Sequence, residues 1–289
     1  HGRTAMSRKV LFVVHAARPK AVEVATAAAK ALISKGIEVG IADSDISLGL
    51  PEVKHCTTTD ACELIMVFGG DGTILRGVEL SRENNLPVLG VNLGHVGFLA
   101  EAEPEDIQTV IDAVVNKSLK VEQRTALSVT VDDGDKTWSS WALNEISIEK
   151  SDSGMANLLL SIDGHRLSQW ACDGILCATP TGSTAYAFSA GGPVVWPEVE
   201  ALLVVPVSAH ALFNRPIVVS PTSVIEVEVN SPAVTISADS RRSFEVTQGA
   251  KVKVVRHNDP VKFARVQQTP FTARLVAKFE LPIQGWRNK

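Results

Sequence analysis

The chain has 289 residues, of which 45% are hydrophobic and 21% charged, and its formal net charge is −4 at pH 7. This length allows one large domain or two ordinary ones, and no apolar run is long enough to cross a membrane. The slightly negative charge, without a basic stripe, argues against nucleic acid or an anionic membrane surface as the main partner.

The cysteines and the first residues bear on the compartment. The four cysteines form no C-x-x-C pair, which argues against structural zinc. Residues 1–5 contain no apolar segment of a signal peptide, and we interpret them as an expression remnant before Met6. We therefore expect reduced thiols and a cytoplasmic protein.

The first part of the chain alternates apolar runs with helical patterns. Pro19 at a first helical turn and Gly36 just past its end delimit the first helix. The alternation predicts a parallel sheet with right-handed crossovers, and the lack of period-2 patterning fits strands buried on both faces. A mobile connection is expected over 43–60. Strands are predicted at 10–14, 37–42, 63–68 and 87–91, and helices at 19–35, 73–83 and 104–117.

From about residue 119 the pattern changes to many short strands with turn residues between them. Asp163-Gly164 predicts a tight hairpin, and the whole region is typical of an antiparallel β domain. A final helix is expected at 271–279. The predicted strands are 126–131, 141–148, 158–162, 165–170, 175–178, 201–205, 224–229, 234–238, 251–255 and 261–266.

The expected fold class is therefore α/β followed by β. A Rossmann-like parallel α/β domain at 6–119 precedes an antiparallel, β-sandwich-like domain at 120–268. The last segment, 269–289, is expected to return to the α/β domain. Ligands of α/β sheets bind beyond the carboxyl ends of the strands, which is where the next motif falls.

Residues 69–73 read Gly-Gly-Asp-Gly-Thr and connect a predicted strand to a predicted helix. Glycines leave backbone N–H groups bare, and such groups at a helix N-terminus bind anions. The structural alternative is a tight turn in which Asp71 caps the helix. Three glycines around one acid at the end of a parallel strand favour phosphate binding.

Asp71 indicates what kind of phosphate chemistry is expected. A carboxylate repels a phosphate, but it fits beside one if it accepts the proton of an attacking hydroxyl, as in a phosphoryl transferase. The turn is neither a Walker loop nor a Gly-x-Gly-x-x-Gly fingerprint. Arg76, on the following helix, is a candidate to reach the donor, with a solvated helix face as the alternative.

A second dense stretch is 173–186, rich in glycine and small hydroxyl residues. It ends at Tyr186, the only tyrosine in the chain, which is available to stack on a base. The structural alternative is a turn capped by Ser183 or Thr184. Upstream, the polar pair Asn144-Glu145 interrupts an apolar segment and needs partners if it is buried; in an edge strand it would lie in water.

Taken together, these motifs resemble the NAD kinase family, from about Lys9 to near the C-terminus. The glycine turn alone is shared with lipid kinases and phosphofructokinases, whereas Thr-Gly-Ser-Thr-Ala-Tyr together with Asn-Glu is far more specific. The matching segments are 69–73, 92–98, 144–145, 179–186, 188–193 and 210–216.

The resemblance implies phosphoryl transfer from ATP, or from polyphosphate, to the 2′-hydroxyl of the adenosine ribose of NAD, which gives NADP. It implies Asp71 as the catalytic base, Mg²⁺ as the ion that neutralises the donor phosphates, and no metal site made by the protein alone. It also implies a homodimer or homotetramer. The residues expected at the donor are Gly70, Gly72, Thr73 and Arg76.

The same resemblance implies a set of NAD-binding residues. Asn144 would bind the adenine and Glu145 the ribose hydroxyls, while Asp173 and Ala209 would lie near the nicotinamide end. The full set is Asp71, Gly72, Phe98, Asn144, Glu145, Asp173, Thr184, Ala185, Tyr186, Ser189 and Ala209.

Two positions depart from the family pattern. The late turn reads Asp239-Ser-Arg-Arg242, with Ser240 where the family often has glycine. Residues 207–210 read Val-Ser-Ala-His, where many members have proline before the histidine.

Two rival functions are weighed against an NAD kinase. A lipid or sugar kinase shares the glycine turn but leaves the pocket around Tyr186 unexplained, and no amphipathic membrane segment is seen. A nucleotide-sensing module gains nothing from Asp71 beside a phosphate.

Overall fold

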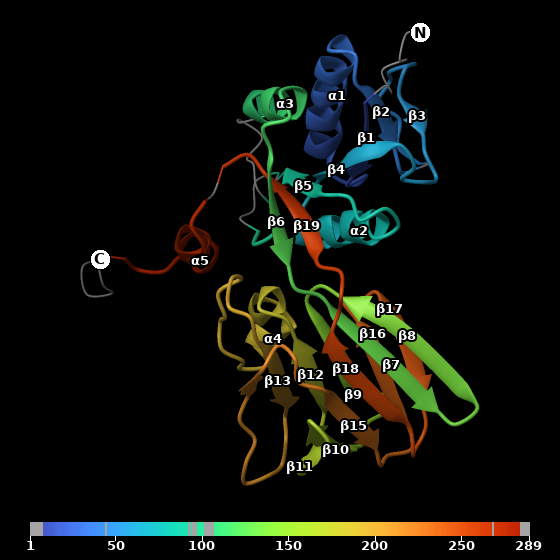
Figure 1. The fold of residues 1–289 in the computed structure, drawn as a ribbon, viewed down its shortest axis with the longest axis vertical. Coiled ribbons are helices and arrows are strands. Elements are labelled where there is room, and N and C mark those ends of the chain that lie inside the picture. Colours follow the sequence, from blue (N-terminus) through green and yellow to red (C-terminus); the bar gives the residue numbers. More distant parts are fainter. Residues whose placement is uncertain are drawn as a thin grey trace. The chain divides into compact units, whose positions relative to one another are not determined.

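A computed structural model describes residues 8–43, 45–91, 93, 97–100, 107–267 and 269–283. The chain divides into two compact units (Figure 1). Unit 1 contains residues 1–123 and 261–289, and unit 2 contains residues 124–260. Each unit is described separately below. No helix among the described residues has both the length and the apolarity needed to span a membrane.

Unit 1 is built on a seven-stranded sheet, in which the first six strands of the order below pair in parallel. The order of β3, β2, β1, β4 and β5 is that of a Rossmann fold, and it reverses direction between β1 and β4. The sheet runs β3 (Lys54–His55), β2 (Glu38–Ile41), β1 (Lys9–Val14), β4 (Cys62–Phe68), β5 (Val88–Val91), β19 (Val261–Arg265) and β6 (Lys120–Arg124).

Three helices cover this sheet: α1 (Pro19–Ser34), α2 (Asp71–Ser81) and α3 (Ile107–Val115). Successive side chains of β4 point to opposite faces. Leu64, Met66 and Phe68 join one apolar cluster with α1 and α3, which lie side by side in Figure 1. Ile65 and Val67 lie next to Gly77 of α2 instead. Both faces are therefore buried, as the unalternating strands predicted.

Two sequence expectations for unit 1 are corrected. The stretch 43–60 contains the strand β3, and Asp43 is tied to the backbone of Val14 by a 3.0 Å hydrogen bond. The run at 261–266, interpreted as one more strand of the β-rich region, forms β19 and pairs in parallel with β5 of unit 1.

The helix α5 (Phe271–Phe279) also belongs to unit 1. Its two terminal phenylalanine rings each lie 5.8 Å from the ring of Phe98. Arg274 donates hydrogen bonds to the carbonyls of Phe98 and Ala100. The chain thus returns to the α/β unit after leaving the β-rich region.

Unit 2 consists of two six-stranded sheets, and every strand pairing recorded in them is antiparallel. The first sheet runs β11 (His165–Cys172), β10 (Ala156–Ile162), β15 (Ile225–Val229), β18 (Lys251–Arg256), β7 (Leu127–Asp133) and β8 (Lys136–Ala142). The second runs β14 (Ile217–Val219), β13 (Leu202–Val207), β12 (Gly174–Ala178), β9 (Glu145–Lys150), β16 (Val234–Ala238) and β17 (Arg242–Val246).

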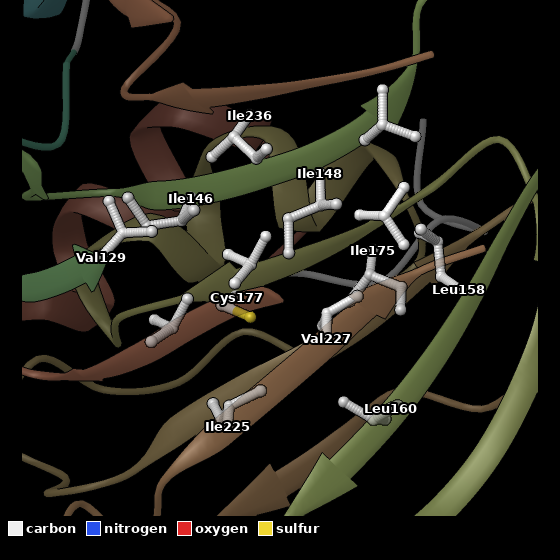
Figure 2. Close-up of a cluster of buried hydrophobic side chains, with 14 of the residues drawn as sticks. Val129, Ile146, Ile148, Leu158, Leu160, Ile175, Cys177, Ile225, Val227 and Ile236 are labelled. Carbon is white, nitrogen blue, oxygen red and sulfur yellow. The ribbon is translucent and has the colours of Figure 1, made fainter. Parts of the chain in front are cut away.

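Alternate residues of the two sheets form one apolar core (Figure 2). Ile146 and Ile148 of β9 and Ile175 of β12 come from the second sheet, and Leu158 and Val227 come from the first. The period-2 burial is what a sheet packed on one face requires. The predicted fold class, a Rossmann-like α/β part followed by an antiparallel β sandwich, is confirmed.

One predicted strand of unit 2 is wrong in an informative way. The segment 141–148 was expected to be a single strand, but it is the end of β8, a turn at Leu143-Asn144 and the start of β9. β9 lies between β12 and β16 and is therefore not an edge strand. The polar pair Asn144-Glu145 thus lies where the chain passes from the first sheet to the second, with Asn144 half-buried and Glu145 buried.

Candidate active site

The glycine-rich turn lies at the carboxyl end of β4, beside the point where the strand order of unit 1 reverses. Gly70 is the N-cap of α2, and its carbonyl accepts the N–H groups of Thr73 and Ile74. The helix therefore begins at Asp71, and Asp71 does not cap it. The N–H groups of Asp71 and Gly72 come before the first intrahelical hydrogen bond, so the helix itself offers them no carbonyl.

The glycines of this turn differ in what they are needed for. A side chain at Gly69 would collide with Thr73, so packing within the turn explains that glycine. Gly70 and Gly72 have open space beside the Cα atom, and neither has a positive φ. Neither packing nor backbone conformation requires glycine there, and the open space leaves the backbone accessible to a ligand.

The Asp71 carboxylate is held by the chain that follows β5. Its Oδ2 accepts the N–H of Phe98 at 3.1 Å, and its Oδ1 accepts the N–H of Leu99 at 3.2 Å. A Cβ at Gly97 would overlap the carboxylate. The carboxylate is therefore fixed at the first turn of α2, and each oxygen keeps a lone pair for another partner.

Arg76 lies one turn further along α2 and is tied to the end of β1. Its guanidinium forms a 2.8 Å ion pair with Asp43 and donates to the carbonyl of Val14 at 3.1 Å. Asp43 in turn accepts the N–H of Val14. This arrangement fixes Arg76 at the carboxyl edge of the sheet with its side chain 38% exposed. No sequence pattern had singled out Asp43.

In unit 2, Glu145 is a buried carboxyl at the start of β9. It is 5% exposed, and its Oε2 has no hydrogen-bond partner among the described residues. Burial raises the pKa of Glu145 to about 7, the charge of Asp239 adds to the rise, and the backbone N–H of Tyr186 opposes it. Such a carboxyl is suited to accept a hydrogen bond from a hydroxyl group of a ligand.

The segment 179–186 packs directly on this turn. The backbone N–H of Thr179 donates to the carbonyl of Asn144 at 2.9 Å, and its hydroxyl donates to the carbonyl of Leu143 at 2.5 Å. Gly182 lies so close to the backbone of Asn144 that any side chain there would overlap it. The structure thus brings together the two polar motifs predicted from the sequence.

The side chains of Tyr186 and Asp173 contact the far end of β9, where Glu149 and Lys150 lie, and not the end that begins at Glu145. The hydroxyl of Tyr186 donates to Glu149 at 2.6 Å, and burial raises the pKa of Tyr186 to about 12. Asp173 pairs with Lys150 at 2.7 Å, and hydrogen bonds from Lys150 and Ser208 lower the pKa of Asp173. The predicted stacking tyrosine therefore has a carboxylate partner.

Other predicted positions have simpler surroundings. Thr184 and Ala185 are half-buried just before Tyr186, while Ser189 is exposed at the end of α4 (Tyr186–Ser189). Ala209 packs against the sandwich core. Asp71 and Phe98 belong to unit 1, and the NAD-binding candidates from Asn144 to Ala209 belong to unit 2.

Sequence reasoning missed the role of Asp239. Its carboxylate accepts hydrogen bonds from the N–H groups of Leu143, Asn144 and Glu145. Both Asp239 and Ser240 have positive φ, at 52° and 54°. The turn therefore keeps a left-handed conformation at 240 although serine stands where the family often has glycine. A lone acid directly after a buried strand was the available signal.

A Rossmann-like sheet with an acid-bearing glycine turn at its carboxyl edge is suited to a nucleotide-binding phosphotransferase. Family models agree and are more specific. The ATP-NAD kinase N-terminal domain matches residues 10–119, and the ATP-NAD kinase C-terminal domain matches residues 143–266. NAD kinase 2 of Streptomyces avermitilis is 50% identical over 98% of this chain and 97% of its own length.

Solved structures agree in fold. Yeast NADH kinase complexed with NADH superposes with a TM-score of 0.87 at 24% identity, over 98% of this chain and 90% of that one. An NAD kinase from Archaeoglobus fulgidus in complex with ATP gives 0.72 at 27% identity, over 94% and 98%. The chain belongs to the NAD kinase family and is a phosphotransferase that forms NADP from NAD.

Proposed function

We propose that Asp71 is the catalytic base of this NAD kinase. In the proposed step, Asp71 accepts the proton of the 2′-hydroxyl of the adenosine ribose. The oxygen then bonds to the γ-phosphorus of ATP while the bond to the departing ADP breaks. The supporting observation is the carboxylate itself, fixed by the N–H groups of Phe98 and Leu99 beside two glycines with open Cα atoms.

On the donor side, the proposed contacts are backbone N–H groups and one guanidinium. Gly70 is the N-cap of α2, and Gly72 and Thr73 lie in its first turn, where the helix dipole favours phosphate oxygens. Arg76 remains paired with Asp43 and offers its other N–H groups to the donor. The proposed donor is ATP, with polyphosphate as a second candidate.

Mg²⁺ is proposed to enter with the donor. No group of three or more histidine, cysteine or acidic side chains gathers in the part of the chain that the structure describes. This fits an ion that binds through substrate phosphates and water, with at most one or two protein carboxylates. When bound, it would supply the charge neutralisation that phosphoryl transfer requires.

For the phosphoryl acceptor, NAD, Glu145 is proposed to accept hydrogen bonds from the ribose hydroxyls and Asn144 to bind the adenine. The unpartnered Oε2 of Glu145 supports this assignment, because a buried carboxylate oxygen without a partner is costly until a hydroxyl reaches it. Phe98, Thr184, Ala185 and Tyr186 are proposed to line the adenine pocket. Asp173, Ser189 and Ala209 complete the proposed set toward the nicotinamide end.

We also propose a homo-oligomer, a dimer or tetramer, located in the cytoplasm. The four cysteines are free thiols, in keeping with a reducing compartment. Leu212 and Phe213, exposed on one loop of unit 2, are apolar groups that a second copy could cover.

The test is a coupled assay with Mg²⁺, NAD and either ATP or polyphosphate, in which an NADP-specific dehydrogenase reports the product. Wild type should form NADP, and Asp71→Asn should lower kcat by at least about a hundredfold, as expected when a general base is lost. The affinity for NAD, measured by calorimetry, should change little.

Asp112→Asn is the matched control, because Asp112 lies on α3 with an exposed carboxylate that accepts a hydrogen bond from Gln108 of the same helix. Its kcat should equal that of wild type. If Asp71→Asn retained kcat, the base would have to be another group. If wild type bound NAD without forming NADP from either donor, a nucleotide sensor would replace the enzyme.

A further inference from the structure

The turn between β8 and β9, which presents Asn144 and Glu145, is bonded from one side by a single carboxylate. Asp239 is 5% exposed and accepts the N–H groups of Leu143 at 2.8 Å, Asn144 at 2.7 Å and Glu145 at 3.3 Å. Its own N–H donates to the carbonyl of Glu145 at 3.0 Å. These partners are more than ninety residues apart in sequence.

Thr179 bonds the same turn from the other side. Thr179 donates hydrogen bonds to the carbonyls of Leu143 and Asn144, while Asp239 accepts hydrogen bonds from the N–H groups of the same two residues. The turn contains neither glycine nor proline. Asn144 is a residue that turns favour, and the bonds to Asp239 and Thr179 then hold its backbone from both sides.

Arg242 anchors Asp239 to the end of β8. Its guanidinium lies 3.6 Å from the Asp239 carboxylate and donates to the carbonyl of Trp141 at 2.6 Å. The same group lies 4.5 Å from the centre of the Trp141 ring. The hairpin of β16 and β17 thus contacts both the end of β8 and the turn that follows it.

We propose that Asp239 is a positioning residue for NAD. It fixes the backbone of Leu143, Asn144 and Glu145 so that the amide and carboxyl groups of the last two meet the adenosine half of the substrate. It also places a carboxylate next to the turn that begins β9. This inference rests on the proposed roles of Asn144 and Glu145, and it adds to them the residue that keeps both in place.

Burial and the charge of Asp239 both raise the pKa of Glu145. The groups that face Glu145 are Asp239 from the β16–β17 turn, Glu149 from its own strand and the N–H of Tyr186 from α4. Burial comes first among the causes that bring the pKa of Glu145 to about 7, and Asp239 comes second. Burial also raises the pKa of Asp239, opposed by its backbone hydrogen bonds and by Arg242.

The test is Asp239→Asn in the full chain, with the KM of both substrates and the Kd of NAD measured from pH 5.5 to 8.5. The amide cannot accept all three N–H groups, so KM for NAD should rise by about tenfold or more, the cost of hydrogen bonds to a charged group. KM for ATP should stay within about twofold, because Asp239 is assigned no contact with the donor.

The pH readout separates positioning from simple loss of structure. In wild type, the affinity for NAD should rise as pH increases through about 7, where Glu145 ionises. Removing the neighbouring negative charge should move this midpoint to lower pH in Asp239→Asn. Asp239→Glu keeps the negative charge, so the pH midpoint of NAD binding should stay the same while KM for NAD still rises. This variant replaces Asp239→Asn in the test if the amide variant does not fold.

Asp163→Asn is the control. Asp163 also has a positive φ, 53°, and also accepts a backbone N–H, that of Val224 at 2.8 Å, in a hairpin turn of unit 2. It should leave KM for NAD and the pH midpoint unchanged. If Asp239→Asn behaved like Asp163→Asn while wild type formed NADP, the positioning role would be rejected and the kinase would stand. If wild type formed no NADP, the proposed function itself would fail.

Discussion

Glu145 shows how one residue can be costly for the fold and useful for the site. A carboxyl that is 5% exposed loses most of its hydration, and its Oε2 gains no partner among the described residues in return. Structural polar groups in a core are normally satisfied. Perturbed carboxyls of this kind concentrate at functional sites, where a ligand supplies the missing partner.

The first prediction at this scale concerns stability against pH in Glu145→Gln. The pKa of Glu145 is raised in the folded state, from 4.5 to about 7, so wild type loses stability as pH rises through that window. Glutamine does not titrate and avoids the loss. Between pH 5 and pH 8 the variant should gain up to roughly 3 kcal/mol relative to wild type.

Urea unfolding without NAD at pH 5, 6, 7 and 8 measures this difference. Glu226→Gln, on the solvent side of β15, is the control and should show no such trend, because Glu226 is exposed. The glutamine variant should also bind NAD more weakly at pH 8. A stability difference that is constant across pH would show that Glu145 is not buried as a titrating group.

At the scale of elements, helix α2 contains two glycines that serve different purposes. At Gly77 a side chain would collide with Val67 of β4, so this glycine lets the helix pack closely on the sheet. At Gly72, in the first turn, a side chain would meet nothing within 4 Å. One glycine is explained by packing, and the other fits the approach of a ligand.

This difference predicts opposite results for two alanine substitutions. Gly77→Ala gains about 1 kcal/mol of helix propensity but loses about 1–3 kcal/mol to overpacking, so stability should fall by about 1 kcal/mol. Gly72→Ala should keep or slightly raise stability and should raise KM for ATP severalfold. Thermal unfolding and initial rates measure both. An increase in melting temperature for Gly77→Ala would contradict the packing argument.

Local sequence signals predicted most helices and strands. They failed where contacts with residues far along the chain determine the local conformation. The strands β1, β2, β4 and β5 of unit 1 and the Asp163-Gly164 hairpin follow from apolar runs and turn residues. The break at Leu143-Asn144 did not, because its turn is held by Asp239 and Thr179 from far along the chain. For the same reason, the polar motifs of the site were predictable, whereas the carboxylate that holds one of them was not.

At the scale of the whole molecule, one unit is inserted into the sequence of the other. Unit 2 occupies residues 124–260, and the strands on either side of it, β6 and β19, are neighbours in the unit 1 sheet. The short apolar run of β19 does not reveal its partner strand, since periodicity alone does not say which strand pairs with which. That is why the sequence pattern grouped it with the strands before it.

Each unit also has its own core. The apolar cluster around Ile146 and Trp170 contains residues of unit 2 alone, and the cluster around Phe12 and Phe68 contains residues of unit 1 alone. A region with its own core and with ends on adjacent strands has the features of an independently folding domain. The fragment 124–260 should therefore fold by itself, with a β-sheet circular dichroism spectrum and a single cooperative unfolding transition.

The fragment also separates binding from catalysis. It contains Asn144, Glu145 and Tyr186 but lacks Asp71, so it should bind the adenosine part of NAD weakly and form no NADP. Calorimetry with NAD and the coupled assay measure the two properties. Trp170→Ala in the fragment is the folding control: Trp170 is fully buried, and its loss should cost about 3–5 kcal/mol and abolish the cooperative transition. A wild-type fragment that unfolds without cooperativity would show that unit 2 depends on unit 1 for its fold.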